Sequence, residues 1–139
     1  IKMKRVHLSK FSIYYEDTDS TGLVYHTSYL KFAERARSNF LREKFPDLQN
    51  LLDFNDFFFV VKEMQINFLK SASLNQDLEI QTFFVDHSFC SINLVQKILR
   101  SNLLLNVINV KLVWVDGKKK KPSKLSENIV ARFNSLEVV

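Results

Sequence analysis

The amino-acid sequence predicts an α+β domain in which one long helix lies against an antiparallel sheet. Its apolar residues follow a strand period first, a helix period next, and a strand period again in several later stretches. The repeated strand–helix units that a parallel sheet requires are missing from this order. Successive strands with short connections favour antiparallel pairing, and the single long helix must bury its apolar stripe on one face of the sheet.

The composition agrees with one domain that spans residues 1–139. The chain is 46% hydrophobic and contains 13 phenylalanines, so it can bury a substantial core. With 2 glycines and 2 prolines it has no linker-like or low-complexity stretch. The net charge of +5 suits a partner that carries phosphates, but no nucleic-acid-binding module is recognisable, and we expect no nucleic-acid partner.

The cysteine content and the apolar runs bear on the compartment. Cys90 is the sole cysteine, which excludes an internal disulfide and favours a reducing environment. The first ten residues, IKMKRVHLSK, lack the apolar centre of a secretory signal, and runs such as FFFVV are too short to span a membrane. We therefore expect a cytoplasmic protein without a membrane span.

The first predicted strand covers residues 7–15, where apolar and polar residues alternate. Phe11, Ile13 and Tyr15 share one face of this strand. The next seven residues, EDTDSTG, break the alternation, and Gly22 can take the positive φ of a tight turn. A loop rich in acid therefore follows the first strand.

A long helix is predicted from Ser28 to about Lys44, with Thr27 or Ser28 as its N-cap. No glycine or proline interrupts this stretch. Its apolar stripe consists of Tyr29, Ala33, Ala36 and Phe40. The two alanines in the middle of the stripe would let the helix approach the sheet closely.

Strand signals dominate the rest of the chain. Further strands are predicted over residues 64–68, 78–85, 89–99 and 103–115. The short RSN turn between the last two predicts an antiparallel hairpin. The letters DGKKKKP end the predicted sheet, and residues 126–133 are expected to form a short terminal helix.

The loop and the helix start carry one long motif, YYEDTDSTGLVYHTSYLKFAERAR, over residues 14–37. It resembles the signature of hotdog-fold acyl-CoA thioesterases of the 4-hydroxybenzoyl-CoA thioesterase type, and within them the bacterial subgroup associated with the Tol-Pal system. The matching positions are Asp17, Thr18, Asp19, Gly22, Val24, Tyr25, His26, Tyr29, Leu30 and residues 34–37. The resemblance implies a curved antiparallel sheet wrapped around one long central helix. It also implies a homodimer or homotetramer with active sites at the subunit boundary.

The resemblance implies hydrolysis of a thioester to free CoA and a carboxylic acid, without a cofactor. It assigns the catalytic carboxylate to Asp19, which would attack the carbonyl or activate a water. A helix N-terminus offers free amides and the positive end of its dipole, so the amides near Tyr25 and His26 are expected to stabilise the oxyanion. The resemblance also gives His26 a supporting role, and Tyr15 and Asp17 are expected to hold the loop.

Several charged residues allow plainer interpretations. Aspartates in turns often bond their own backbone, which applies to Asp17 and Asp19 as well. Lys70, Lys118 and Lys119 are candidates for the phosphates of CoA by charge alone, and a solvated lysine run explains the last two equally well. Glu34 has the spacing of an ordinary helical ion pair.

A calcium loop is the main competing interpretation of DTDSTG. With Asp17 as its first position, Gly22 falls correctly at the sixth. The twelfth position, which needs a bidentate glutamate, is Ser28. No cluster of histidine and cysteine suggests zinc, so no metal site is expected.

Two other functions stay open at this point. A hotdog hydratase acting on enoyl-CoA would keep the fold but needs a motif that is not found here. A non-catalytic module could bind acyl-CoA, acyl carrier protein or proteins of the cell envelope machinery, and its basic charge would suit the acidic carrier protein. The acyl chain, the choice of CoA or carrier protein, and dimer against tetramer are not readable from the sequence.

Overall fold

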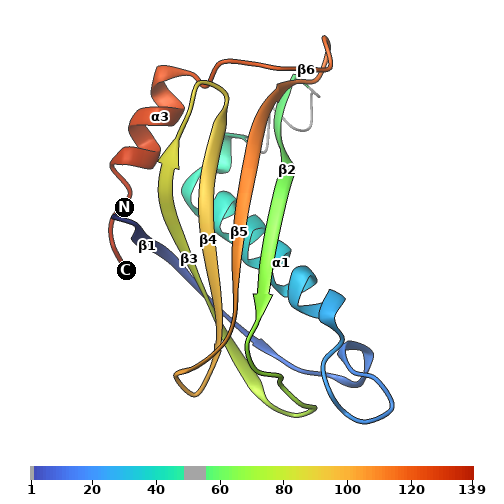
Figure 1. Ribbon diagram of the computed structural model, residues 1–139. Helices are drawn as coiled ribbons and strands as arrows, with labels where there is room; N and C mark the ends of the chain where they lie inside the picture. Colours follow the sequence, from blue (N-terminus) through green and yellow to red (C-terminus); the bar gives the residue numbers. More distant parts are fainter. Residues whose placement is uncertain (1, 49–55) are drawn as a thin grey trace.

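The computed structural model describes residues 2–48 and 56–139 and places one sheet around one long helix (Figure 1). The elements are β1 (Lys4–Ser12), the short 3₁₀ helix η1 (Tyr15–Asp17), α1 (His26–Lys44), β2 (Phe57–Phe68), β3 (Asp77–His87), β4 (Ser91–Arg100), β5 (Leu103–Asp116), β6 (Lys121–Pro122) and α3 (Glu127–Asn134). Among the described residues, no helix combines the length and the apolar character that a membrane crossing needs.

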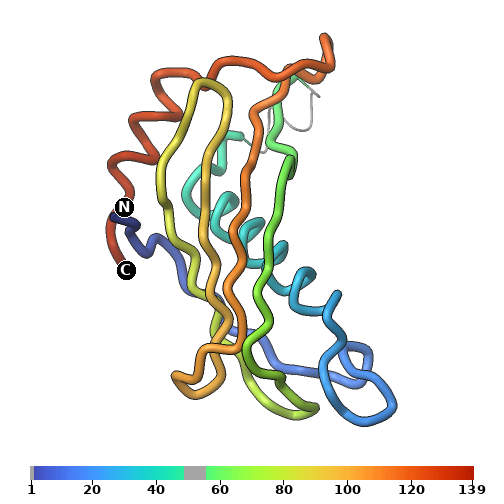
Figure 2. The backbone as a smooth tube through the Cα atoms, viewed as in Figure 1, coloured from blue at the N-terminus to red at the C-terminus, as the bar shows by residue number. Residues whose placement is uncertain are grey.

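The sheet is antiparallel at every pairing of its described strands. Its order is β1-β3-β4-β5-β2, and the two-residue strand β6 pairs with β5. The strands bend around α1, and the two chain ends lie close together beside α3 (Figure 2). A bond of 3.0 Å from the Val139 amide to the Arg5 carbonyl joins these ends. The prediction of an α+β fold with an antiparallel sheet wrapped around one long helix is confirmed.

The core lies between α1 and the inner face of the sheet. All four residues of the predicted stripe, Tyr29, Ala33, Ala36 and Phe40, are at most 1% exposed. The missing bulk at the alanines allows close approach, and the Ala33 carbonyl accepts a hydrogen bond of 3.0 Å from Gln96 on β4. The helix is therefore fixed to the sheet at its middle as well as by apolar packing.

The helix begins two residues earlier than predicted, at His26, and its N-cap is Tyr25. The expected cap of Thr27 or Ser28 is wrong. The Ser28 hydroxyl instead donates to the Asp17 carbonyl at 3.0 Å, so a contact across the loop outweighs local capping. This contact ties the start of α1 to the acidic loop.

The first strand ends at Ser12, which is earlier than predicted. Tyr15 lies in η1 and is 81% exposed, so its expected place on the same face as Ile13 is wrong. The Asp17 carboxylate accepts from the Tyr14 amide at 3.0 Å and turns the chain at this point. The alternation of apolar and polar residues in the sequence continues to Tyr15, although the strand ends at Ser12. It does not mark the turn because the turn depends on the side chain of Asp17, three residues after Tyr14.

The later strands differ from the prediction mainly at their bounds. β2 begins at Phe57, well before residue 64. The sequence does not reveal this start because residues 57–61, FFFVV, are a continuous apolar run without alternation. The hairpin between β4 and β5 is confirmed, with Ser101 and Asn102 both at positive φ. β6 extends the sheet into the segment that was expected to end it.

Candidate active site

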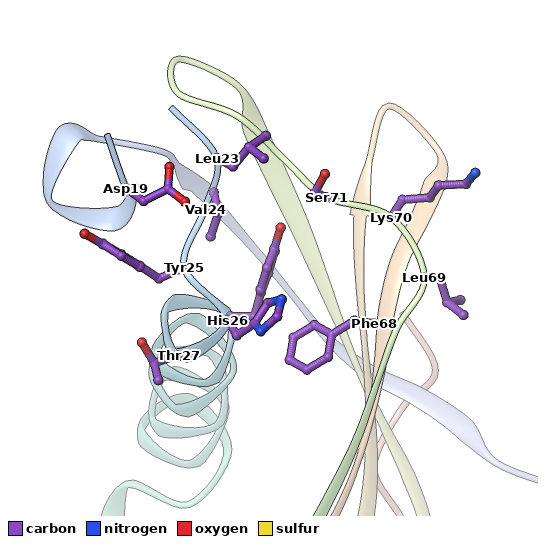
Figure 3. Close-up of a pocket in the computed structure, with 11 residues that line it drawn as sticks. Asp19, Leu23, Val24, Tyr25, His26, Thr27, Phe68, Leu69, Lys70 and Ser71 are labelled. Carbon is purple, nitrogen blue, oxygen red and sulfur yellow. The ribbon is translucent and has the colours of Figure 1, made fainter. Parts of the chain in front are cut away.

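A pocket of about 710 Å³ opens where the N-terminus of α1 meets the end of β2 (Figure 3). It is lined by Asp19, Leu23, Val24, Tyr25, His26, Thr27, Tyr29 and residues 68–71. Three of the predicted catalytic residues, Asp19, Tyr25 and His26, therefore lie around one cavity together with Lys70. The predicted loop-holding residues and the other two lysines lie outside its lining.

The acidic loop is a tight turn that presents Asp19 to the pocket. The Asp19 amide donates to the Leu23 carbonyl at 2.9 Å, and the Gly22 amide returns a bond of 3.1 Å to the Asp19 carbonyl. Gly22 has a φ of 82°, in the left-handed region that glycine takes without strain. A bridge between Thr18 and Val24 closes the base of the turn.

The two oxygens of the Asp19 carboxylate have different surroundings. Oδ1 accepts from the Thr21 amide at 2.8 Å and also from the Thr21 hydroxyl. These bonds lower the pKa of Asp19 below its ordinary value, and the Leu23 backbone adds a smaller effect in the same direction. In the described part of the chain Oδ2 has no hydrogen-bond partner. The plainer interpretation, in which Asp19 bonds the backbone of its own turn, therefore holds for Oδ1. It leaves Oδ2 available to a substrate or to a water.

The helix entrance supplies backbone donors near Tyr25 and His26. The Tyr25 amide itself already donates to the Asp17 carbonyl at 3.0 Å, so it is not free to bind an oxyanion in this structure. Within residues 2–48 and 56–139, the amides of His26 and Thr27 have no recorded acceptor. They are the first free amides of α1 and sit at the positive end of its dipole.

The His26 ring forms part of the pocket wall. It stacks on Phe68, with ring centroids 4.4 Å apart and planes inclined by 28°. In Figure 3 the ring faces Phe68, and the Tyr25 ring extends to the other side of the helix start. His26 and Tyr25 therefore direct their rings to different sides of the helix start.

Asp17 holds the loop, as expected, whereas the Tyr15 side chain does not. Asp17 is 7% exposed, and it bonds to Tyr14 through its carboxylate and to Tyr25 and Ser28 through its carbonyl. Tyr15 takes part only through its carbonyl, which accepts from the Thr18 amide at 3.2 Å. Its ring is exposed, so its predicted side-chain contribution is absent from the described chain.

A sequence profile named for the thioesterase-like superfamily matches residues 14–133, which includes the loop, α1 and the whole sheet from β2 onward. The chain belongs to this superfamily. An acyl-CoA thioesterase YbgC from Haemophilus influenzae is 37% identical over 125 residues, covering 90% of this chain and 92% of the relative. An acyl-CoA thioester hydrolase YbgC from Escherichia coli O157:H7 is 42% identical over 122 residues, covering 87% and 90%.

Solved structures of thioesterases share the fold. A probable thioesterase from Bartonella henselae superposes with a TM-score of 0.77 at 32% identity, over 86% of this chain and 98% of the other. A 1,4-dihydroxy-2-naphthoyl-CoA thioesterase from Synechocystis gives a TM-score of 0.84 at 20% identity, over 94% and 96%, which is a likeness of fold alone. The hotdog fold that the motif suggested is confirmed.

The lysines predicted to bind substrate separate into two groups. Lys70 lines the pocket, and its side chain extends away from the cavity in Figure 3. Lys118 and Lys119 follow β5, beside the start of β2, because Phe57 pairs with Asp116. The pocket lies at Phe68, eleven residues along the same strand and about 35 Å away. A single chain does not bring these two lysines to the site.

Sequence reasoning identified only Lys70 on the opposite wall of the pocket. The other residues of this wall, Phe68, Leu69 and Ser71, come from the end of β2 and the loop after it, and no local motif marks them. Tyr29 was assigned to the motif and to the apolar stripe, but it also lines the cavity, and its hydroxyl accepts from the Ala72 amide at 2.8 Å. The Val24 amide donates to the Ala72 carbonyl at 3.0 Å, and Leu23 forms a bridge with Ser73, so these contacts hold this wall beside the acidic loop. Among the described residues, no group of three or more metal-ligating side chains comes together.

Proposed function

We propose that this protein is an acyl-CoA thioesterase, which hydrolyses its substrate to free CoA and a carboxylic acid. The observation that carries the proposal is one pocket lined both by Asp19, which has a carboxylate oxygen without a hydrogen bond among the described residues, and by His26 and Thr27, which have free amides. The YbgC relatives, which carry the names acyl-CoA thioesterase and thioester hydrolase, support it.

The proposed chemistry needs an ionised carboxylate and an oxyanion donor. With Asp19 as general base, the carboxylate takes a proton from water while the water oxygen attacks the thioester carbon. With Asp19 as nucleophile, Oδ2 attacks that carbon and water then hydrolyses the resulting anhydride. In both routes the C–S bond breaks, CoA leaves as the thiol after gaining a proton, and the amides of His26 and Thr27 stabilise the oxyanion.

His26 and Lys70 have positioning roles in this proposal. The imidazole, packed on Phe68, borders the space for the reacting group and shapes the wall beside it. Lys70 extends toward solvent from the rim, where a phosphate group of CoA would lie. Neither His26 nor Lys70 lowers the pKa of Asp19, because the hydrogen bonds from Thr21 are the main cause of that shift.

We infer a homodimer through β2, with a homotetramer as the larger assembly expected from the motif. β2 ends the sheet order and pairs only with β5 among the described strands, so its other edge offers free backbone groups. Val60 and Val61 are 38% and 45% exposed along this edge. Antiparallel pairing of two β2 strands about their midpoint would bring the second copy's Lys118 and Lys119 toward Phe68.

The cellular context belongs to the same proposal. A cytoplasmic location, acyl carrier protein as a second carrier and a link to the Tol-Pal system are expected from the sequence alone. Each stays a prediction.

The decisive test measures CoA release by the purified protein from a panel of acyl-CoA thioesters. Asp19→Asn is expected to lower kcat about 100-fold or more, since it removes the base or nucleophile. Glu16→Gln, a neighbouring exposed acid outside the pocket, is the matched control and should keep wild-type activity. An Asp19→Asn protein that folds and keeps most of its activity would refute these roles. Hydration of crotonyl-CoA without CoA release would favour the hydratase, and tight binding without turnover the non-catalytic module.

A further inference from the structure

Asn106 on β5 is a fully buried carboxamide that forms no hydrogen bond within the described residues. Its exposed fraction is 0%, and both Nδ2 and Oδ1 are without a partner. Buried polar groups in native proteins are nearly always bonded, so an orphaned carboxamide requires an explanation. Since both atoms are unpaired, the conclusion does not depend on which of them is nitrogen.

The sheet register places Asn106 directly behind the pocket. Its partner on β2 is Phe68, and paired residues in an antiparallel sheet project from the same face. The alternation of β5 puts Asn106 on the inner face with the buried residues Ile108 and Val110. The Leu105 carbonyl also accepts the amides of Leu69 and Lys70, at 2.8 and 3.0 Å, so this part of β5 is bonded to the pocket wall.

Phe68, the cross-strand neighbour of Asn106, is the side chain of this pair that lines the cavity. Its ring is 42% exposed, lines the pocket, and contacts the rings of His26 and Tyr29 with centroids 4.4 and 6.0 Å away. It ends β2, where one side of the strand is unpaired in the single chain.

Gln96 shows what a satisfied carboxamide looks like on the same inner face. Its Oε1 accepts from Arg37 at 2.9 Å, and its Nε2 donates to the Ala33 carbonyl and the Thr82 hydroxyl. These bonds satisfy both polar atoms of the Gln96 carboxamide, so this polar side chain is stable in the core. The residues that the structure describes supply no such partners for Asn106, so its carboxamide is available to a ligand.

The pair of unsatisfied atoms defines the chemistry of that partner. A carboxamide offers a donor at Nδ2 and an acceptor at Oδ1. A carbonyl or a carboxylate would satisfy only the donor, whereas one hydroxyl group accepts from Nδ2 and donates to Oδ1. A neutral hydroxyl also enters a buried site without the cost of desolvating a charge.

We propose that the acyl end of the pocket extends past Phe68 to Asn106 and selects acyl groups that carry a hydroxyl. The identity of the ligand as an acyl thioester rests on the proposed function. In this arrangement the thioester lies at Asp19 and the first amides of α1, and the acyl chain displaces the Phe68 ring. Asn106 is then a specificity-determining residue that contacts the substrate away from the reacting carbon.

The test measures binding separately from turnover. In the Asp19→Asn background, calorimetry compares butyryl-CoA with each enantiomer of 3-hydroxybutyryl-CoA. One enantiomer is expected to bind about tenfold more tightly than butyryl-CoA, the effect of one or two buried hydrogen bonds. Adding Asn106→Leu should abolish this preference, leave butyryl-CoA binding unchanged or tighter, and raise the thermal unfolding midpoint. Gln96→Leu, the matched control, should lower the midpoint and keep the preference.

Equal dissociation constants for the three ligands, or a hydroxyl preference that survives Asn106→Leu, would overturn the inference. If wild type then still hydrolyses butyryl-CoA, the thioesterase proposal stands alone. If no acyl-CoA is hydrolysed but Asn106→Leu removes a measured hydroxyl preference, the inference holds for a binding site and the proposed activity fails.

Discussion

The amide nitrogen of Tyr25 lies 3.0 Å from the carbonyl oxygen of Asp17, and this bond joins the acidic loop to the first turn of α1. Because the Asp17 carboxylate also fixes the Tyr14 amide, one buried residue sets both ends of the loop that carries Asp19. The distance between the carboxylate and the free helix amides therefore depends on a residue outside the pocket lining.

Asp17→Ala is expected to lower kcat/KM for acyl-CoA hydrolysis about tenfold or more, because small displacements of a catalytic group are costly. Loss of the bond to Tyr14 should also reduce the free energy of unfolding by about 1 kcal/mol. Steady-state kinetics and urea unfolding measure the two effects. Asp17→Asn keeps an acceptor oxygen and should stay near wild type. Unchanged kinetics in the alanine variant would show that the loop holds Asp19 without this carboxylate.

Thr21 is expected to set the acid side of the pH–rate profile. Its hydrogen bonds are the main cause of the lowered pKa of Asp19. The ionised form is the active one, so activity is lost as pH falls through this pKa. Thr21→Val removes the hydroxyl, raises the pKa of Asp19 and should move the acid limb of kcat/KM to higher pH. Thr21→Ser is the control that keeps the bond, and identical acid limbs for the two variants would contradict this origin of the limb.

The sequence was most informative where periodicity and burial coincide. The stripe of α1 from Tyr29 to Phe40 was predicted because each of its residues faces the sheet. The motif also identified Asp19 and the helix entrance, since these residues are neighbours in the chain. Both successes rest on local information.

The failures share a dependence on contacts between distant segments. The cap at Tyr25 and the occupied Tyr25 amide arise from Asp17, eight residues earlier. Phe68 enters the site because of the pairing of β2 with β5, and Asn106 becomes informative only when its lack of partners is known. No periodicity encodes either relationship, so only the folded arrangement could reveal them.

The buried guanidinium of Arg37 makes Gln96 important for stability. Arg37 is 6% exposed, and burial lowers its pKa, although an arginine stays protonated. Gln96→Leu removes its bond of 2.9 Å and should reduce the free energy of unfolding by about 2–4 kcal/mol. The double variant Arg37→Met/Gln96→Leu should recover much of this loss, because both polar partners are then replaced together. Urea unfolding of the three proteins tests the pair, and a single variant as stable as wild type would contradict it.

The exposed edge of β2 predicts the assembly. Val61→Asp places a charge on the unpaired side of the sheet and should convert a dimer into monomers, measured by analytical ultracentrifugation across a range of concentrations. Leu103→Asp is the control, which introduces the same charge at the start of β5. Leu103 is 41% exposed and Val61 is 45% exposed. The control variant should keep the dimer. A wild-type protein that sediments as a monomer throughout would remove the basis for this assembly.

The lysine run after β5 provides a functional readout of the same dimer. Among the described residues, the Lys118 side chain forms only an exposed ion pair with Asp56, at 3.3 Å, and a weak surface pair of this kind can yield to a ligand held by a second copy. Lys118→Glu should raise KM for acyl-CoA about fivefold, because it reverses a charge near the nucleotide phosphates. KM for the matching N-acetylcysteamine thioester, which lacks those phosphates, should not change. Lys124→Glu, a lysine beyond β6, serves as the control for overall charge. If Lys118→Glu alters neither substrate, or both equally, then the run is a solvated surface and CoA is bound by other residues.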